Sequence, residues 1–441
     1  MELKIRNVNK IKSADIQLNG LTVIVGENDS GKSTIGRVLF SAIKALVNTK
    51  ASKIQKQEEL LDKHVQSLYR RLSSTGYGGF SVATKRNVSP IPRNAYEFIS
   101  ELKKNNSIDE YIKGVSFFIE NLEATPRMKS LMKEDLHLIG ICMKEKDNRA
   151  ANLFAEFRFL LESEFLNQFG SNNNVSINLL SDDKSKSYFS YSADKDAVES
   201  HCEDEEALED ITYIESPLYL HMLDSLMYAG AYREIDKRRR SVTPLIPYHI
   251  KDFVEKMNAS RSFLPSVDQF KLFIEKPINT QDIIGGSFSY DNNRKSIVFL
   301  KNGMAILPLN TASGVKSFGV IQMLLDGEYI DANRPLIWDE PENHLHPEWQ
   351  IEFAKILVQI YRSGVPVIVT THSPYFLQAI RYFAAKEKAE DFVSYYMSQP
   401  IGDGFVTMDN VTNDLNKVFK KLAAPLTSIM NIDAVRQGID L

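Results

Sequence analysis

The segment that most restricts what this chain can fold into is Gly26-Glu27-Asn28-Asp29-Ser30-Gly31-Lys32-Ser33. It fits the pattern G-x-x-x-x-G-K-[ST], in which the glycines let the backbone curl until successive N–H groups point at phosphate oxygens. The apolar run Leu21–Val25 predicts a buried strand before it, and apolar residues at helical spacing within 35–46 predict a helix after it. Such a helix directs its positive end at the same phosphates. The segment therefore predicts a phosphate-binding loop in a strand–loop–helix unit.

The side chains of this loop suit a nucleotide that carries a metal ion. Lys32 can reach the β- and γ-phosphates, and the hydroxyl of Ser33 is a suitable ligand for Mg²⁺. The other candidates for nucleotide contact in the loop are Gly26, Asn28, Ser30, Gly31 and Thr34. The expected cofactors are therefore ATP and Mg²⁺.

A second candidate element joins an apolar strand to an acidic pair. The run Pro335–Trp338 is followed directly by Asp339 and Glu340. Asp339 is expected to hold Mg²⁺, directly or through water, and Glu340 to orient and deprotonate the attacking water. Strands also end in Asp-Glu at ordinary surfaces, so the pair gains its meaning from the phosphate-binding loop about 300 residues earlier.

A histidine follows the next apolar strand. His372 comes just after the expected buried strand Val365–Thr370. Ligands of parallel sheets bind in the crevice at the carboxyl ends of the strands, where this side chain is placed. His372 is therefore a candidate hydrogen-bond donor to a γ-phosphate, although a lone histidine is more often structural.

A fourth segment, Asn310–Ser317, precedes the acidic strand. At an expected helix start, Ser313 offers a hydroxyl and Gly314 an N–H group to an anion. An ordinary helix N-cap is the alternative interpretation.

The order of the segments predicts an α/β protein with insertions. Strand and helix alternate in the last third of the chain, which favours a parallel sheet with crossover helices. Between them, the narrow apolar stripe of Lys53–Leu72 is not a sustained heptad, so a short helical insertion is expected rather than a long coiled coil. The expected parts are a first lobe over 1–49, a helical insertion over 50–174, head strands over 175–217, a second helical insertion over 218–284, the rest of the head over 285–390 and a C-terminal tail over 391–441.

Three local patterns carry further expectations. Asn19-Gly20 after Ile16–Leu18 is a hairpin signal. The acidic run Glu203–Asp210 is expected to be a solvated helix face. The basic cluster Lys237–Arg240 is either a contact to the phosphates of DNA or tRNA or, more commonly for such runs, a solvated surface segment.

Composition limits the classes of protein to which the chain can belong. The chain has 441 residues, 43% of them hydrophobic, and a net charge of −4, which argues against a generally basic nucleic-acid binder. Its two cysteines exclude a disulfide scaffold and fit a reducing compartment. No stretch approaches the roughly 20 apolar residues of a membrane helix. We therefore expect a cytoplasmic protein without a membrane partner.

The four motifs, in this order and spacing, resemble the ATP-binding cassette (ABC) fold, and within it the branch of the SMC and overcoming-lysogenization-defect (OLD) ATPases. Asp339–Pro347 is similar to the extended acidic motif of that branch, Thr371-His372-Ser373-Pro374 to its switch histidine and Thr311–Ser317 to its degenerate signature. The resemblance implies a P-loop NTPase with a two-lobed ABC-type head. It also implies a homodimer or higher homo-oligomer in which two heads sandwich two ATPs. Ser313, Gly314 and Lys316 of one head would then contact the γ-phosphate held by the other.

Two features of the family are not recognisable as motifs in this sequence. A Mg²⁺-sensing glutamine usually follows the helix after the P-loop, but the candidates Gln55, Gln57 and Gln66 fall in the expected insertion. The acidic clusters of the nuclease domain of OLD proteins are not seen after His372. The chain thus resembles the stand-alone ATPase subunits of two-gene phage-defence systems such as Septu and PARIS, whose nuclease is a separate chain.

The function expected from this resemblance is an ATPase that regulates or scaffolds a separate nuclease in antiviral defence. The leading alternative is an SMC-like ATPase acting mechanically on DNA, which calls for long heptad arms. A transporter cassette would carry the full Leu-Ser-Gly-Gly-Gln signature, which is absent. A scaffold that binds ATP without turnover is the third alternative, and Glu340 argues against it.

Overall fold

The structure is a computed structural model, and it describes residues 1–18, 20–75, 91–92, 94–104, 107–144, 149–166, 168, 174–181, 187–193, 197–199, 208–228, 246–259, 278, 280–294 and 296–430. The chain divides into two compact units. The first, here called the head unit, contains Met1–Val47 and Ala150–Leu441, and the second, the helical unit, contains Asn48–Arg149.

An 11-stranded sheet forms the centre of the head unit, in the order β6-β5-β4-β1-β2-β14-β13-β3-β12-β11-β7. Its strands are β1 (Glu2–Val8), β2 (Ile11–Gln17), β3 (Leu21–Val25), β4 (Ser176–Leu180), β5 (Ser187–Ser192), β6 (Ala197–Glu199), β7 (Thr212–Ile214), β11 (Leu336–Asp339), β12 (Val367–Thr371), β13 (Val393–Gly402) and β14 (Phe405–Asn410). The five strands from β13 to β7 are parallel to one another, whereas β1, β2, β4, β5 and β6 pair antiparallel.

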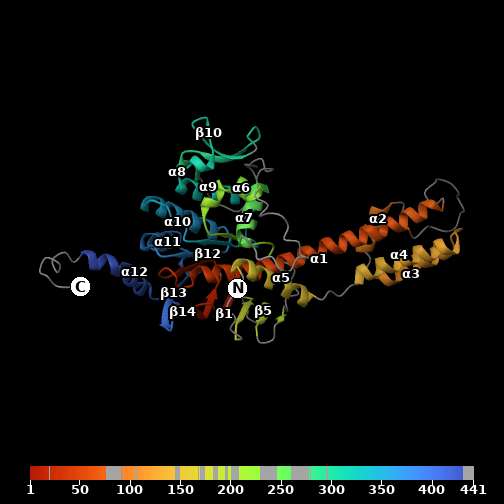
Figure 1. The fold of residues 1–441 in the computed structure, drawn as a ribbon, viewed down its shortest axis with the longest axis horizontal. Helices are drawn as coiled ribbons and strands as arrows, with labels where there is room; N and C mark the ends of the chain where they lie inside the picture. The colour runs from red at the N-terminus through yellow and green to blue at the C-terminus, as the bar shows by residue number, and fades with distance from the viewer. Residues whose placement is uncertain are drawn as a thin grey trace. The chain divides into compact units, whose positions relative to one another are not determined.

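The parallel strands are buried on both faces. In β3, Val23 and Val25 belong to one hydrophobic core and Ile24 to another, because successive side chains of a strand point to opposite faces. One face packs against the first part of α1 (Lys32–Ser74) and against α5 (Arg149–Glu164). The other packs against α9 (Ser313–Asp326), α10 (Pro347–Arg362) and α11 (Pro374–Lys386), which lie together in Figure 1. This arrangement is the α/β layering expected from the sequence.

A three-stranded antiparallel sheet packs onto the core that contains α9, α10 and α11. Its strands are β8 (Ser287–Asp291), β9 (Ser296–Lys301) and β10 (Met304–Ile306). The remaining elements of the head unit are η1 (Pro217–His221), α6 (Leu223–Tyr228), α7 (Tyr248–Ala259), α8 (Thr280–Ile284), η4 (Pro308–Asn310), η5 (Glu390–Phe392) and α12 (Leu415–Met430).

The helical unit contains the rest of α1 together with α2 (Ala95–Lys104), α3 (Ile108–Glu120) and α4 (Pro126–Lys144). The stripe of α1 is buried in a core of its own, which contains Leu61, Val65, Leu68 and Leu72. The buried carboxylate of Asp135 accepts hydrogen bonds from Ser67 and Arg71. The apolar stripe of α1 thus packs in the core of the helical unit.

The Asn-Gly signal near residue 20 does not make a hairpin, and that prediction is wrong. The strands on its two sides, β2 and β3, are separated in the sheet by β14 and β13. Asn19 itself lies outside the described residues. The apolar strand β3 instead takes the buried central position between β13 and β12, both of which come from the end of the chain. The region assigned to a tail therefore supplies two strands of the sheet.

The described end of the acidic run is not a helix face. Asp210 lies outside any helix or strand. It accepts from Lys44 Nζ at 2.5 Å and pairs with Lys256 Nζ at 2.9 Å. Burial acts to raise the pKa of Asp210, but the two lysines hold it below its usual value. Residues 200–207 lie outside the described part of the chain.

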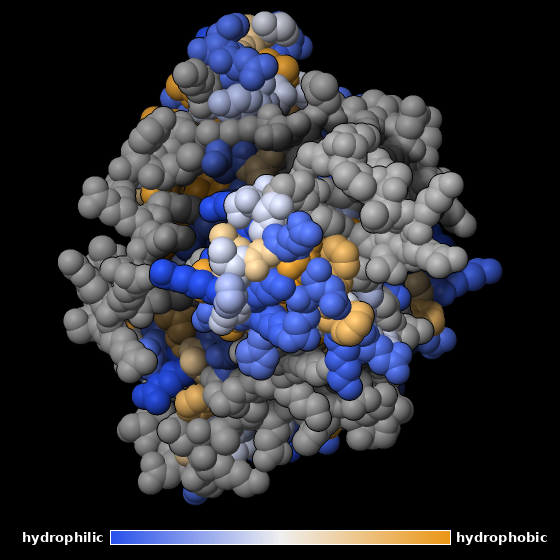
Figure 2. All heavy atoms as spheres, turned by 90° about the vertical axis from the view of Figure 1, so that its right-hand side faces the viewer, coloured by the Kyte–Doolittle hydropathy of each residue, from blue (hydrophilic) through white to orange (hydrophobic). Residues whose placement is uncertain are grey.

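In the face shown in Figure 2, hydrophilic residues predominate among the coloured atoms, and hydrophobic ones form separate small patches. Among the described helices, none is long and apolar enough to cross a membrane.

Candidate nucleotide site

Three motifs meet at one edge of the sheet. The loop after β3, the acidic pair at the end of β11 and the histidine after β12 all lie at the carboxyl ends of adjacent parallel strands. The N–H of Gly26 donates to the carbonyl oxygen of Thr371 at 3.3 Å, which joins the first loop directly to the third. The sheet therefore brings together residues that are more than 300 positions apart in the sequence.

The backbone of the loop needs its glycines. Gly31 has φ +80°, a conformation that side chains disfavour. A Cβ on Gly26 would lie 2.2 Å from Ser398 Oγ and 2.5 Å from Ser30 Oγ. The loop thus leaves no room for a side chain where its backbone turns.

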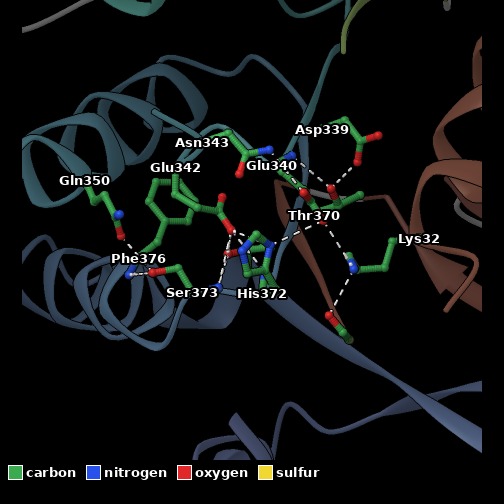
Figure 3. A network of polar contacts seen from close by, with 12 residues as sticks. Lys32, Asp339, Glu340, Glu342, Asn343, Gln350, Thr370, His372, Ser373 and Phe376 are labelled. Carbon is green, nitrogen blue, oxygen red and sulfur yellow. Dashed lines mark hydrogen bonds and ion pairs between the residues drawn. The ribbon is translucent and has the colours of Figure 1, made fainter. Parts of the chain in front are cut away.

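Lys32 begins α1 and points into the cluster (Figure 3). Its ammonium group donates to the carbonyl oxygens of Gly26 at 2.9 Å and Glu27 at 2.7 Å, and it lies 3.3 Å from Glu340 Oε1. The lysine is only 4% exposed. A buried cation beside glycine-rich backbone is the arrangement expected for phosphate contact.

Two hydroxyl groups hold the carboxylate of Asp339. Thr370 Oγ1 donates to Oδ1, and Tyr213 Oη donates to Oδ2 at 3.1 Å. Tyr213 comes from β7, the neighbouring strand at the edge of the sheet. Burial and the nearby charge of Asp339 raise the pKa of Tyr213, which keeps its hydroxyl protonated as a donor.

Glu340 has a left-handed backbone, with φ +46°. Its N–H donates to Thr370 Oγ1 at 3.0 Å, and its side chain accepts from Asn343 Nδ2 at 3.1 Å. Burial acts to raise the pKa of Glu340, but Asn343, Lys32 and His372 hold it below its usual value. Such strained backbone persists only where the surroundings fix it and is frequent at active sites.

Glu342 fastens the acidic turn to the loop after β12 (Figure 3). Its Oε1 accepts from Thr371 Oγ1 at 2.6 Å and from the N–H groups of His372 and Ser373 at 2.9 and 3.3 Å. The residue is 4% exposed, and burial raises the pKa of its carboxyl. Glu342 lies within the acidic motif Asp339–Pro347 but was not among the residues predicted for the site.

His372 lies between two carboxylates. Its Nδ1 is 3.3 Å from Glu340 Oε1 and 3.5 Å from Glu342 Oε1. The next residue, Ser373, caps α11 and donates to Gln350 Oε1 at 2.7 Å. The candidates Lys32, Asp339, Glu340 and His372 therefore form one connected polar cluster.

The residues of the signature-like segment lie elsewhere in the head unit. Ser313 and Gly314 begin α9, and a Cβ on Gly314 would lie 2.9 Å from the ring of Trp349. Lys316 is 4% exposed, with Nζ 3.3 Å from His221 Nδ1, and burial lowers its pKa. Among the described residues, no hydrogen bond or ion pair connects these three to the cluster around Lys32.

The family's Mg²⁺-sensing glutamine is not found directly after β7, the edge strand beside β11. The carboxyl end of β7 leads instead into Glu215, which pairs with Arg37 and His249. Gln66 lies in the helical unit and donates to Asp62 at 3.5 Å. The side chains of Gln55 and Gln57 and the basic cluster Lys237–Arg240 lie outside what the structure describes.

The other loop candidates fit a polyphosphate in different degrees. Ser30 Oγ is buried and has no hydrogen-bond partner among the described residues. Ser33 and Thr34 are partly exposed at the start of α1, and Asn28 is exposed. An orphaned hydroxyl within a glycine-framed loop, next to a buried lysine and an oriented carboxylate, fits a phosphate group with a divalent cation.

This fold and this cluster define a P-loop NTPase. The sequence matches the family described as AAA ATPase domain over residues 1–377, and the chain belongs to that family.

Comparisons with individual proteins are more distant. The uncharacterized protein MJ1542 of Methanocaldococcus jannaschii is 28% identical over 163 residues, which cover 34% of this chain and 18% of that protein. The SMC head domain from Thermotoga maritima is 12% identical, with a TM-score of 0.34 and coverage of 93% of this chain and 98% of that one. An Smc head domain with an extended coiled coil, bound to the C-terminal domain of ScpA from Pyrococcus furiosus, is 10% identical, with a TM-score of 0.30 and coverage of 96% and 98%.

Proposed function

We propose that this chain binds ATP with Mg²⁺ and hydrolyses it to ADP and phosphate at the cluster between α1, β11 and β12. The observation that carries the proposal is the position of Glu340. Its Oε1 lies 3.3 Å from Lys32 Nζ and 3.3 Å from His372 Nδ1, so a candidate base stands beside two cationic or hydrogen-bonding groups suited to a γ-phosphate.

Each residue of the cluster has a distinct task in this proposal. Lys32 and the loop from Gly26 to Gly31 hold the phosphates, and His372 donates to the terminal one. Ser33 and Asp339 hold Mg²⁺, which when bound neutralises phosphate charge. Glu340 orients a water and takes its proton.

Nucleotide binding tests the first step directly. Titration calorimetry of wild type should show ATP binding that Lys32→Ala abolishes, because the buried cation is lost. Lys355→Ala is a suitable control, since Lys355 is partly exposed on α10 and pairs with Glu352. Unchanged ATP affinity in Lys32→Ala would refute the proposed site.

We also propose that Ser313, Gly314 and Lys316 complete the site of a second copy of the chain. Within the described part of the chain, no hydrogen bond or ion pair joins them to the cluster of their own head, and Lys316 is buried without a described carboxylate partner. Hydrolysis should then require a homodimer or higher homo-oligomer. Ser313→Arg and Lys32→Ala should each be inactive, yet partly active when mixed, because some mixed dimers retain one intact site. No recovery in demonstrably mixed dimers would contradict the shared site.

At the level of the cell, we propose that the ATPase regulates or scaffolds a separate nuclease in antiviral defence. Its support is the resemblance of the acidic and histidine motifs to OLD-like ATPases together with a helical unit that an ATP site does not need. The purified chain should cleave neither plasmid, linear DNA nor tRNA with Mg²⁺ or Mn²⁺, with or without ATP. Cleavage that follows the chain through purification and survives Lys32→Ala would overturn this part.

An SMC-like DNA-maintenance ATPase is the alternative, and one assay separates the two. In the alternative, ATP should retain the protein on closed circular plasmid in high salt, and linearising the plasmid should release it. A nuclease regulator should show no such dependence on DNA topology.

A further inference from the structure

Tyr213 lies beneath the acidic pair and is completely enclosed. It is 1% exposed and occupies the middle of β7, in register with Ile337 of β11. Its hydroxyl donates to Asp339 Oδ2 at 3.1 Å. No motif marks this residue, because its partner is 126 positions away in the sequence.

The ring of Tyr213 has little freedom. The ring of His249 lies 4.7 Å away at an interplanar angle of 35°, and the ring of Phe40 lies 6.1 Å away. On the side of α1, a Cβ on Gly36 would lie only 3.5 Å from the carbon that bears the hydroxyl. The helix that follows the P-loop is therefore closely packed over the tyrosine, and the position of its hydroxyl is set by contacts around the ring.

His249 is itself fixed by charge. Its Nδ1 lies 2.7 Å from Glu164 Oε2 and its Nε2 3.0 Å from Glu215 Oε2, and Arg37 donates to Glu215 at 2.8 Å. His249 and Glu164 are essentially inaccessible to solvent, whereas Glu215 and Arg37 are partly exposed. Hydrogen bonds between charged groups in a buried network restrict the motion of His249, which packs against the tyrosine.

The chemistry of the two donors matters as much as their position. A carboxylate rotates broadly about its terminal bond, so hydrogen bonds decide its orientation. Tyr213 and Thr370 each donate one neutral hydroxyl to a different oxygen of Asp339. Neutral donors orient the group without cancelling its charge, and each oxygen keeps a further lone pair for a cation.

We propose that Tyr213 is a positioning residue that orients Asp339 toward Mg²⁺. This inference rests on the proposed function, in which Asp339 is a metal ligand. Groups that hydrogen-bond to metal ligands commonly change metal affinity by about 10- to 100-fold when they are removed. Tyr213 is thus expected to act on the metal through Asp339, without touching nucleotide.

The substitution Tyr213→Phe tests the role because it removes one oxygen and keeps the packed ring. The readout is the Mg²⁺ concentration at which binding of a fluorescent ATP analogue is half maximal. We expect this concentration to rise about 10-fold, while affinity for the analogue in EDTA stays at the wild-type value.

A matched control is present in the same buried network. Tyr219 also donates its hydroxyl to a carboxylate, Glu215 Oε2 at 2.9 Å, but among the described contacts it has no hydrogen bond to Asp339. Tyr219→Phe should leave the Mg²⁺ dependence unchanged. Denaturant unfolding of both variants should give similar, small losses of stability.

The outcomes separate this inference from the proposed function. An unchanged Mg²⁺ dependence in Tyr213→Phe, with Mg²⁺-dependent binding intact in wild type, overturns the role of Tyr213 alone. Equal shifts in Tyr213→Phe and Tyr219→Phe also overturn it, because the effect would belong to the network as a whole. If wild type binds no nucleotide, the proposed function fails and the inference fails with it.

Discussion

Replacing Glu342 tests whether the acidic turn is held to the loop that carries His372. Glu342→Ala removes the acceptor of three hydrogen bonds. The N–H of Ser373 keeps Thr371 Oγ1 as a second acceptor at 3.0 Å, and the Thr371 hydroxyl can rotate. Among the described residues, the structure gives the N–H of His372 no second acceptor.

The expected decrease in the free energy of unfolding follows from these hydrogen bonds. A hydrogen bond to a charged group contributes about 1.5–3 kcal/mol, and an unsatisfied buried donor costs about 1–3 kcal/mol. Part of the loss is offset, because burial of Glu342 disfavours its charged form and alanine removes that penalty. The net decrease in the free energy of unfolding should be about 2–4 kcal/mol. Glu342→Gln keeps the volume and one acceptor oxygen, so it should lose about 1 kcal/mol or less.

Urea unfolding followed by circular dichroism measures both values, provided that the denaturant slope is unchanged. Amide exchange of His372 and Ser373 should accelerate in Glu342→Ala and stay near wild type in Glu342→Gln. The reasoning is refuted if the alanine variant loses less than about 0.5 kcal/mol, or if the glutamine variant loses as much as alanine.

Three further outcomes are expected. Glu340→Gln should retain ATP binding but slow hydrolysis by about 10²–10⁴-fold in a phosphate-release assay, and turnover near wild type would assign the base elsewhere. Gly319→Ala should destabilise the head unit by about 1–3 kcal/mol in urea, because its Cβ would lie 2.2 Å from Phe288, whereas Gly114→Ala, with nothing within 4 Å, should not. Two glutamates raise the pKa of His249 from 6.5 to about 9 against the effect of burial, so its stabilisation is complete below pH 6.5 and is lost as pH rises through about 9. The free energy of unfolding should therefore fall by on the order of 3 kcal/mol over that window, and a flat profile would exclude a charged His249.

The local parts of the site could be predicted from the sequence because each depends on a few contiguous residues. The P-loop pattern places Lys32 after a strand and at the start of a helix, and the structure has both. Glu340 became a candidate because it follows an apolar strand, and His372 because ligands of parallel sheets bind at the carboxyl ends of the strands. Each of these inferences needs only a strand end and a turn.

The supporting residues could not be predicted in the same way. Tyr213 meets Asp339 only because β7 pairs with β11 in one register, and no local pattern specifies that pairing. The burial of Lys316 depends on the packing of α9 against the rest of the head, which helical spacing does not reveal. The Asn-Gly signal failed for the same reason, since long-range pairing decided the neighbours of β3.

The position of β3 has a consequence for the order of events during synthesis. Both of its neighbours, β12 and β13, come from residues after 366, and no other strand of the described residues pairs with it. A nascent chain thus carries its phosphate-binding loop on an unpaired apolar strand until nearly the whole of the head has left the ribosome. Such non-local pairing makes folding slow and leaves apolar surface open to association in the meantime. The phosphate-binding loop is therefore encoded more than 300 residues before the two strands that flank its own strand in the sheet.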